Sequence, residues 1–257
     1  MLIGEPPPTQ ADLHFRVFGF PVRVHPFFWL VTFLLGSRAE EPTEVFVWVA
    51  VVFVSILIHE LGHATLQRHY GGHARITLYS FGGLASCNDC DRSPKSQLAI
   101  LFAGPLAGFF FAAAVLLAIT LSGHNAGIDI ARSAEDVSLT HRADSFNLVG
   151  NLYAYFQSFH SPILDLVLEK LIFVNIAWGL LNLLPVYPLD GGQISRELFT
   201  LGNPRSGIIQ SLQLSIGVAA LLAAYFLMKE RYYTGLMFGY FAYANIQTLQ
   251  AYRNNWR

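Results

Sequence analysis

Two histidines four residues apart, with a glutamate directly after the first, form the most chemically informative stretch of this sequence: His59-Glu60-Leu61-Gly62-His63. On a helix the two imidazoles share one face, about 6 Å apart along the axis, so both can bind one small cation. Neutral imidazoles suit zinc, and a neighbouring carboxylate can take a proton from a water that the metal activates. The pattern therefore predicts zinc-dependent hydrolysis, with His59 and His63 as metal ligands and Glu60 as general base.

The residues before this motif are typical of a membrane helix. Val45 to Ile58 are fourteen nearly all apolar residues that lead directly into His59. A helix from Val45 to about Tyr70 is long enough to cross a hydrocarbon layer of about 30 Å. The following Gly71-Gly72 is expected to end it. The sequence therefore places the predicted chemistry inside a membrane.

The composition supports a polytopic membrane protein. Of 257 residues, 53% are hydrophobic, 13% are charged and 21 are phenylalanine, which is more apolar surface than a soluble core of this size would bury. A net charge of −1 without a basic tract argues against nucleic-acid binding. Residues 1–10 lack the basic start and apolar run of a signal peptide, and residues 1–12 are expected to form a flexible cytoplasmic tail.

The expected fold is an all-α polytopic membrane protein with about six transmembrane helices and a small membrane-associated β-hairpin or sheet. Alternating residues predict short strands within residues 13–25 and 74–81. The polar stretch 122–162 is expected to carry one or two surface helices. Residues 13–257 are expected to form one integral membrane domain, with a catalytic core at about 45–200 and accessory helices at about 206–250. The expected membrane helices are 27–35, 45–70, 98–121, 163–184, 208–228 and 232–249.

Lysine and arginine are unevenly distributed between alternate loops. The side that holds both termini has more of them, so the positive-inside rule places both termini in the cytoplasm. The loops that follow His63 and Asp190 lie on the same side in this topology. We therefore expect an integral protein of a prokaryotic inner membrane.

Asp190 is the best candidate for a third metal ligand. A catalytic zinc usually takes three protein ligands. Asp190 follows Pro185 and Pro188 and precedes two glycines, where an apolar helix must break. A carboxylate there is unfavourable in a membrane unless it is paired or bound to metal.

Two motifs resemble those of the site-2 protease family of intramembrane zinc metalloproteases. The first is His59 to His63, and the second is Asn182-Leu183-Leu184-Pro185-Val186-Tyr187-Pro188-Leu189-Asp190-Gly191-Gly192, similar to the family's Asn-to-LDG signature. Gly82-Gly83 and Ala103-Gly104-Pro105-Leu106 also fit its pattern. The chain resembles a minimal member without PDZ or CBS domains.

The resemblance implies cleavage within or beside the transmembrane segment of a single-span protein in the lipid bilayer. It implies that Asn182 holds the substrate carbonyl or its oxyanion. It also implies one zinc per chain, bound by His59, His63 and Asp190, with Glu60 as general base. The substrate's identity and any regulatory membrane partner stay open.

A substrate helix must unwind before hydrolysis, because its carbonyls are hydrogen-bonded. We hypothesise that the unwound segment pairs with the edge of the 74–81 hairpin. Proline substitutions at Thr77 or Tyr79 that leave cleavage untouched would argue against this mode of capture.

Two rival functions belong to other classes. A catalytically silent homologue could act as a membrane scaffold or chaperone, but Glu60 and all three predicted ligands are present. A zinc transporter or storage protein would favour several intramembrane ligand clusters, and the sequence predicts one. Metalloprotease activity is therefore the preferred interpretation.

Several other residues invite chemical interpretations. Cys87 and Cys90 form a C-x-x-C motif, a redox pair or half of a structural zinc site, although a cytoplasmic loop is expected to keep both reduced. Asn175 is expected to make an interhelical hydrogen bond. His25 is expected at the membrane interface or in packing, and His73 in a solvated turn.

Overall fold

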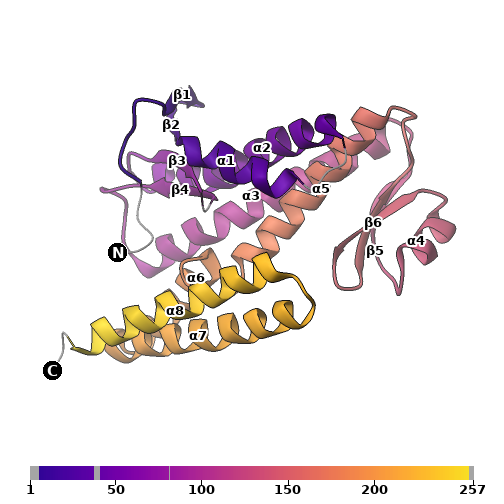
Figure 1. The fold of residues 1–257 in the computed structure, drawn as a ribbon. Coiled ribbons are helices and arrows are strands. Elements are labelled where there is room, and N and C mark those ends of the chain that lie inside the picture. Colours follow the sequence, from indigo (N-terminus) through magenta and orange to yellow (C-terminus); the bar gives the residue numbers. More distant parts are fainter. Residues whose placement is uncertain (1–5, 38–40, 81, 255–257) are drawn as a thin grey trace. The chain divides into compact units, whose positions relative to one another are not determined.

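The computed structural model describes residues 6–37, 41–80 and 82–254. Across them the chain forms eight α-helices and seven β-strands (Figure 1). It divides into two compact parts. Of the described residues, the larger part comprises 6–90 and 103–180, and the smaller part comprises 91–102 and 181–254.

The larger part contains a four-stranded sheet built from two hairpins. Both hairpins are antiparallel, and they join through parallel pairing of Val22–Val24 with Ile76–Leu78. The first lies within the predicted residues 13–25, whereas the second extends to Ser86, beyond the predicted residues 74–81. Parallel strands need a long crossover, which the first two helices provide. The strand order is β1-β2-β3-β4, with β1 at Leu13–Val17, β2 at Phe20–Val24, β3 at Arg75–Tyr79 and β4 at Gly82–Ser86.

Helix α1 (Pro26–Gly36) begins directly after the sheet. His25 accepts a hydrogen bond on Nδ1 from the Phe27 backbone N–H at 3.2 Å, and Pro26 occupies the first helical position. His25 is buried. The packing role predicted for this histidine is therefore confirmed, in the form of a helix cap.

Helix α2 (Pro42–His69) is the long apolar helix predicted to carry the metal ligands. It ends at the predicted glycine break: Gly71 has φ +86°, and the Gly72 N–H donates to the Gln67 carbonyl at 3.0 Å. One face of α2 packs with α1 and the sheet in a common apolar core. That core includes Val22, Val24, Phe28, Val51, Val52, Ile56, Ile76 and Leu78.

Residues 122–162 depart from the prediction of surface helices alone. They contain one helix and a three-stranded sheet in the order β5-β7-β6. The central strand is buried on both faces: Ala154 and Phe156 pack with the apolar core of α3 and α5, and Tyr153 and Tyr155 pack with Val137. Burial on both faces removes the alternation that identifies a strand. The elements are β5 (Ala126–Ile130), α4 (Ala134–His141), β6 (Asp144–Val149) and β7 (Leu152–Phe156).

The smaller part is built around three helices that follow the predicted proline-glycine break. Helix α6 (Asp190–Gly202) was not predicted, whereas α7 (Pro204–Met228) and α8 (Tyr232–Asn254) match the expected last two helices. Helices α7 and α8 pack side by side (Figure 1). Their shared core contains Val186, Ala219, Ala223, Phe238, Phe241 and Ala242.

Three helices in the described part of the chain are long and apolar enough to cross a membrane: α2, α3 (Pro94–Leu121) and α7. Helix α1 is apolar but shorter. Helix α5 (Pro162–Asn182) carries Asp165, Glu169 and Lys170 in its first half. All six predicted membrane segments are therefore helical, while six complete spans stay a prediction.

An ion pair joins the turn after α2 to the loop after β4. The Asp89 carboxylate contacts His73 Nδ1 and accepts the His73 backbone N–H at 2.9 Å. These hydrogen bonds raise the pKa of His73 and lower the pKa of Asp89. His73, expected in a solvated turn, is indeed exposed, and its ring is also paired with Asp89.

The pH dependence of this ion pair can be predicted. Because the pKa of His73 is higher in the folded state, the protonated ring stabilises the fold at pH values below the unfolded pKa of about 6.5. This stabilisation is lost as the pH rises through the folded pKa. A lowered aspartate pKa contributes above about 3.9, so the pair is strongest between about pH 4 and 6.5. We expect Asp89→Asn to lower the His73 pKa in an NMR titration. An unchanged titration would show that Asp89 does not cause the shift.

Candidate active site

The histidine pair lies on one face of α2, in the geometry that the sequence predicts. The Nε2 atoms of His59 and His63 are 3.1 Å apart, and the residues are only 3% and 6% exposed. Two nitrogens bound to one zinc at about 2.05 Å in a tetrahedral arrangement stand about 3.3 Å apart. The spacing of the pair therefore fits two ligands of a single zinc ion.

Gly104 of α3 keeps the space beside these two nitrogens clear. A Cβ atom at this position would stand 2.2 Å from His63 Nε2 and 2.7 Å from His59 Nε2. At Gly62, a Cβ would stand 2.3 Å from the Ala103 carbonyl oxygen, so the α2 and α3 backbones approach closely. The small residues recognised in the sequence therefore make room for the ligand pair.

Glu60 is buried and lies against the first residues of β4. A Cβ at Gly83 would stand 2.5 Å from Glu60 Oε1, and a Cβ at Gly82 would stand 2.7 Å from the Trp178 ring. Gly82 also has φ +119°. This backbone conformation turns the chain back along β3, so the two glycines open β4.

Two hydrogen bonds hold α2, one of them a turn before the ligand pair and the other a turn after it. Asn175 Nδ2 donates to Ser55 Oγ at 2.9 Å, which confirms the predicted interhelical bond. Gln67 Nε2 donates to the Ala85 carbonyl of β4 at 3.0 Å. Sequence reasoning assigned no role to Ser55 or Gln67, although both are polar residues in a predicted membrane helix.

The second motif lies in the smaller part of the chain. Asn182 is the last residue of α5, and Asp190 is the first residue of α6; both are buried. Asp190 was expected to end a broken helix, but it begins a new one. The glycines after it are needed for tight packing: a Cβ at Gly191 would stand 2.2 Å from the Leu183 carbonyl oxygen, and one at Gly192 would stand 2.2 Å from the Tyr187 nitrogen.

Helices α7 and α8 bind the segment that leads to Asp190. The Tyr187 N–H donates to Ser215 Oγ at 3.1 Å, and Asn245 Nδ2 donates to the Tyr187 carbonyl at 2.6 Å. Ser215 and Asn245 are buried. Sequence reasoning missed both residues, and their polarity within apolar helices was the available signal.

Asn245→Ala is expected to weaken zinc binding without removing a metal ligand. Loss of the hydrogen bond from Asn245 to the Tyr187 carbonyl costs about 1–3 kcal/mol and loosens the segment before Asp190. Zinc should be lost at a several-fold lower chelator concentration than in the wild type, measured as zinc per chain. Thr248→Ala, an exposed change on the same helix, is the matched control. Equal zinc retention in both variants would contradict this positioning role.

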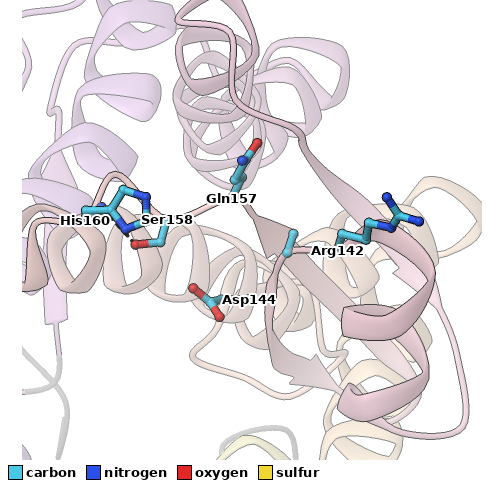
Figure 2. A pocket seen from close by; sticks show the side chains of 6 residues that line it. Arg142, Asp144, Gln157, Ser158 and His160 are labelled. Atoms are coloured by element: carbon cyan, nitrogen blue, oxygen red, sulfur yellow. Dashed lines mark hydrogen bonds between the residues drawn. The ribbon is translucent and has the colours of Figure 1, made fainter.

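An open hollow of about 280 Å³ lies elsewhere in the larger part. It is formed where β6 begins and where the chain leaves β7, and Figure 2 shows the polar side chains that line it. None of the predicted catalytic or metal-binding residues lines it. Its lining residues are Arg142, Ala143, Asp144, Gln157, Ser158 and His160.

The structure has apolar helices long enough to span a membrane, and one of them carries a glutamate and a buried histidine pair whose spacing fits zinc. This combination is that of a membrane-embedded metalloprotein. Residues 47–224 match the sequence model of peptidase family M50, and the chain therefore belongs to this metalloprotease family. The predicted resemblance to site-2 proteases is therefore confirmed, and with it an integral membrane protein.

Named relatives and a solved structure agree with this assignment. The zinc metalloprotease MJ0392 of Methanocaldococcus jannaschii is 25% identical over 218 residues, covering 83% of this chain and 52% of the relative. Stage IV sporulation protein FB of Bacillus subtilis is 28% identical over 186 residues, covering 71% and 49%. The chain thus spans about half the length of these relatives. The site-2 protease structure from M. jannaschii shares the fold, with TM-score 0.58, 20% identity and coverage of 93% of this chain and 95% of that one.

Proposed function

We propose that this chain is an intramembrane zinc endopeptidase that cleaves peptide bonds within or beside the transmembrane segments of single-span proteins. The observation that carries the proposal is the His59–His63 pair, buried on an apolar helix with its Nε2 atoms 3.1 Å apart. Glu60 lies on the same turn of α2, and Gly104 leaves room beside the two nitrogens.

His59, His63 and Asp190 would hold one zinc ion. Two imidazoles and one carboxylate are a usual ligand set of catalytic zinc, which leaves a coordination position open. When bound, zinc supplies Lewis-acid activation of water and of the substrate carbonyl at neutral pH. We include Asp190 because of its place in the family motif and its burial at the start of α6.

Glu60 and Asn182 have the side-chain chemistry that the remaining steps need. The Glu60 carboxylate accepts a proton from the attacking water and delivers it to the nitrogen of the leaving amine. The Asn182 amide donates a hydrogen bond to the oxygen of the scissile carbonyl, on which negative charge develops. Burial of both residues reduces competition from bulk water.

Strand β4 is the edge at which an unwound substrate segment would pair. The earlier hypothesis pointed to Thr77 and Tyr79, but both lie in β3, which is paired with β2 on one side and β4 on the other. The proline test therefore moves to β4. Gly83, the second residue of this strand, also lies beside Glu60, so pairing there would bring a peptide bond toward the general base.

The proposed topology places both termini in the cytoplasm and the site in an inner membrane. The excess of lysine and arginine on the terminal side supports this orientation.

Zinc removal tests the proposed activity. The full chain, reconstituted in lipid vesicles with single-span substrate proteins, is expected to cleave them at or near the membrane segment. A zinc chelator should abolish cleavage, and added zinc should restore it. Cleavage that continues at zero zinc per chain would overturn the proposal, as would a zinc-loaded protein that cleaves no member of a broad set of single-span proteins.

A further inference from the structure

Cys87 and Cys90 form a disulfide in the loop directly after β4. Two reduced thiols were expected at these positions, and the structure corrects that expectation. The turn through Asn88 and Asp89 brings the two Cα atoms to 5.9 Å, within the range that a disulfide can bridge. The motif is therefore able to exist in an oxidised form.

The sulfur pair packs against the end of the metal-binding helix. A Cβ at Gly72 would stand 2.2 Å from each of the two sulfur atoms, so only glycine admits them. Cys90 Sγ lies 3.6 Å from the carbonyl oxygen of Gln67, one turn after His63. The Gln67 side chain in turn binds β4 through Ala85. The pair thus packs the chain directly after β4 against the last turn of α2.

The surroundings also accommodate the reduced form. Cys87 Sγ lies 3.2 Å from Asp89 Oδ1, and Cys90 Sγ faces the Gln67 carbonyl. Each reduced thiol therefore has an acceptor for its S–H group. Both cysteines are partly exposed, and Asn88 and Asp89 between them are exposed, so a small thiol can reach the sulfurs.

We propose that Cys87 and Cys90 are a reversible thiol–disulfide site that responds to low-molecular-weight thiols and disulfides and sets how firmly β4 is held against α2. In reduction, an external thiolate attacks one sulfur, the Cys87–Cys90 bond breaks, and the released cysteine takes a proton. A second external thiol then resolves the mixed disulfide. The products are two cysteine thiols and one oxidised small disulfide, and reoxidation is the reverse exchange.

The consequence for catalysis rests on the proposed function. Gly83 of β4 packs against the predicted general base Glu60, and the disulfide lies just beyond the other end of the same five-residue strand. Reduction opens the loop that the disulfide closes and loosens its packing against α2, which is expected to increase the motion of β4 beside Glu60. The thiol chemistry and the strand motion do not depend on proteolytic activity.

The test uses the full chain in vesicles, equilibrated with mixtures of reduced and oxidised glutathione and then alkylated. Mass spectrometry should find two alkyl groups in reducing mixtures and none in oxidising ones. Amide hydrogen exchange across residues 82–86 should become several-fold faster on reduction. The Cys87→Ser/Cys90→Ser variant should exchange at the faster rate in both mixtures. An alkylation state that never changes, or exchange rates that do not respond to reduction, would overturn the proposal.

A metal site is the competing interpretation of the same residues. Ligand atoms of Cys87, Asp89 and Cys90 lie within 4.8 Å of one another. If the reduced protein binds two zinc ions and the double serine variant binds one, the cysteines form a metal site and the proposal is wrong. If the reduced protein and the double serine variant each bind one zinc ion, the thiol–disulfide assignment is supported. If alkylation and amide hydrogen exchange respond as expected but the protein cleaves no substrate, the result counts against the proposed function and not against the thiol–disulfide site.

Discussion

Glu60→Gln is expected to lower the rate of substrate cleavage by at least about 100-fold while one zinc per chain is retained. Glutamine has the same length and still forms hydrogen bonds, but it cannot accept the proton of the attacking water at neutral pH. Loss of a general base typically removes a factor of about 10²–10⁴. Glu60 is buried against Gly83, so bulk water cannot easily replace it.

The measurement is kcat/KM for a single-span substrate in vesicles, together with zinc per chain by elemental analysis. Glu44→Gln is the matched control, because Glu44 is an exposed acidic residue in the first turn of the same helix. The control should cleave at the wild-type rate. Comparable cleavage by Glu60→Gln and wild type would remove Glu60 from the mechanism. Loss of zinc from Glu60→Gln would point instead to a role in holding the metal.

Gly104→Ala is expected to reduce zinc binding from one ion per chain to nearly none. The added Cβ would stand 2.2 Å from His63 Nε2 and 2.7 Å from His59 Nε2, which is closer than nonbonded atoms can approach. The two histidines have little room to move aside, because the α2 and α3 backbones are in close contact here: a Cβ at Gly62 would stand 2.3 Å from the Ala103 carbonyl oxygen. The methyl group must therefore displace the imidazoles, and cleavage should disappear together with zinc.

Zinc content, cleavage rate and thermal unfolding should be measured on the same preparation of this variant. Gly217→Ala on α7 is the control, because no heavy atom lies within 4 Å of a Cβ at that position. It should bind zinc and cleave as the wild type does. If Gly104→Ala remains folded and binds zinc with wild-type affinity, the space beside the two nitrogens is not where the metal lies.

Local sequence was enough to predict the part of the site that lies within a single helix. His59 and His63 share a face because their spacing matches one helical turn, whatever surrounds them. The apolar run before them predicts a membrane helix by length alone. The glycine and proline breaks at Gly71 and Pro185 follow from backbone conformation. These features need only neighbours along the chain.

Contacts between distant segments could not be read in the same way. Pairing of β2 with β3 depends on the α1–α2 crossover, and β7 escaped prediction because burial on both faces hides its alternation. Two features of the site depend on contacts between segments far apart in the chain. Gly83 leaves space for Glu60, and Ser215 and Asn245 form hydrogen bonds with the Tyr187 backbone.

The identities of the chemical groups and their spacing along one helix were thus determined by the sequence itself. The space around those groups, the hydrogen bonds that hold α2 and the segment before Asp190, and the placement of the Cys87–Cys90 pair beside Gly72 were decided by tertiary structure. The physical reason is range: backbone geometry and helical period act over a few residues, whereas steric fit depends on which distant surfaces are packed together.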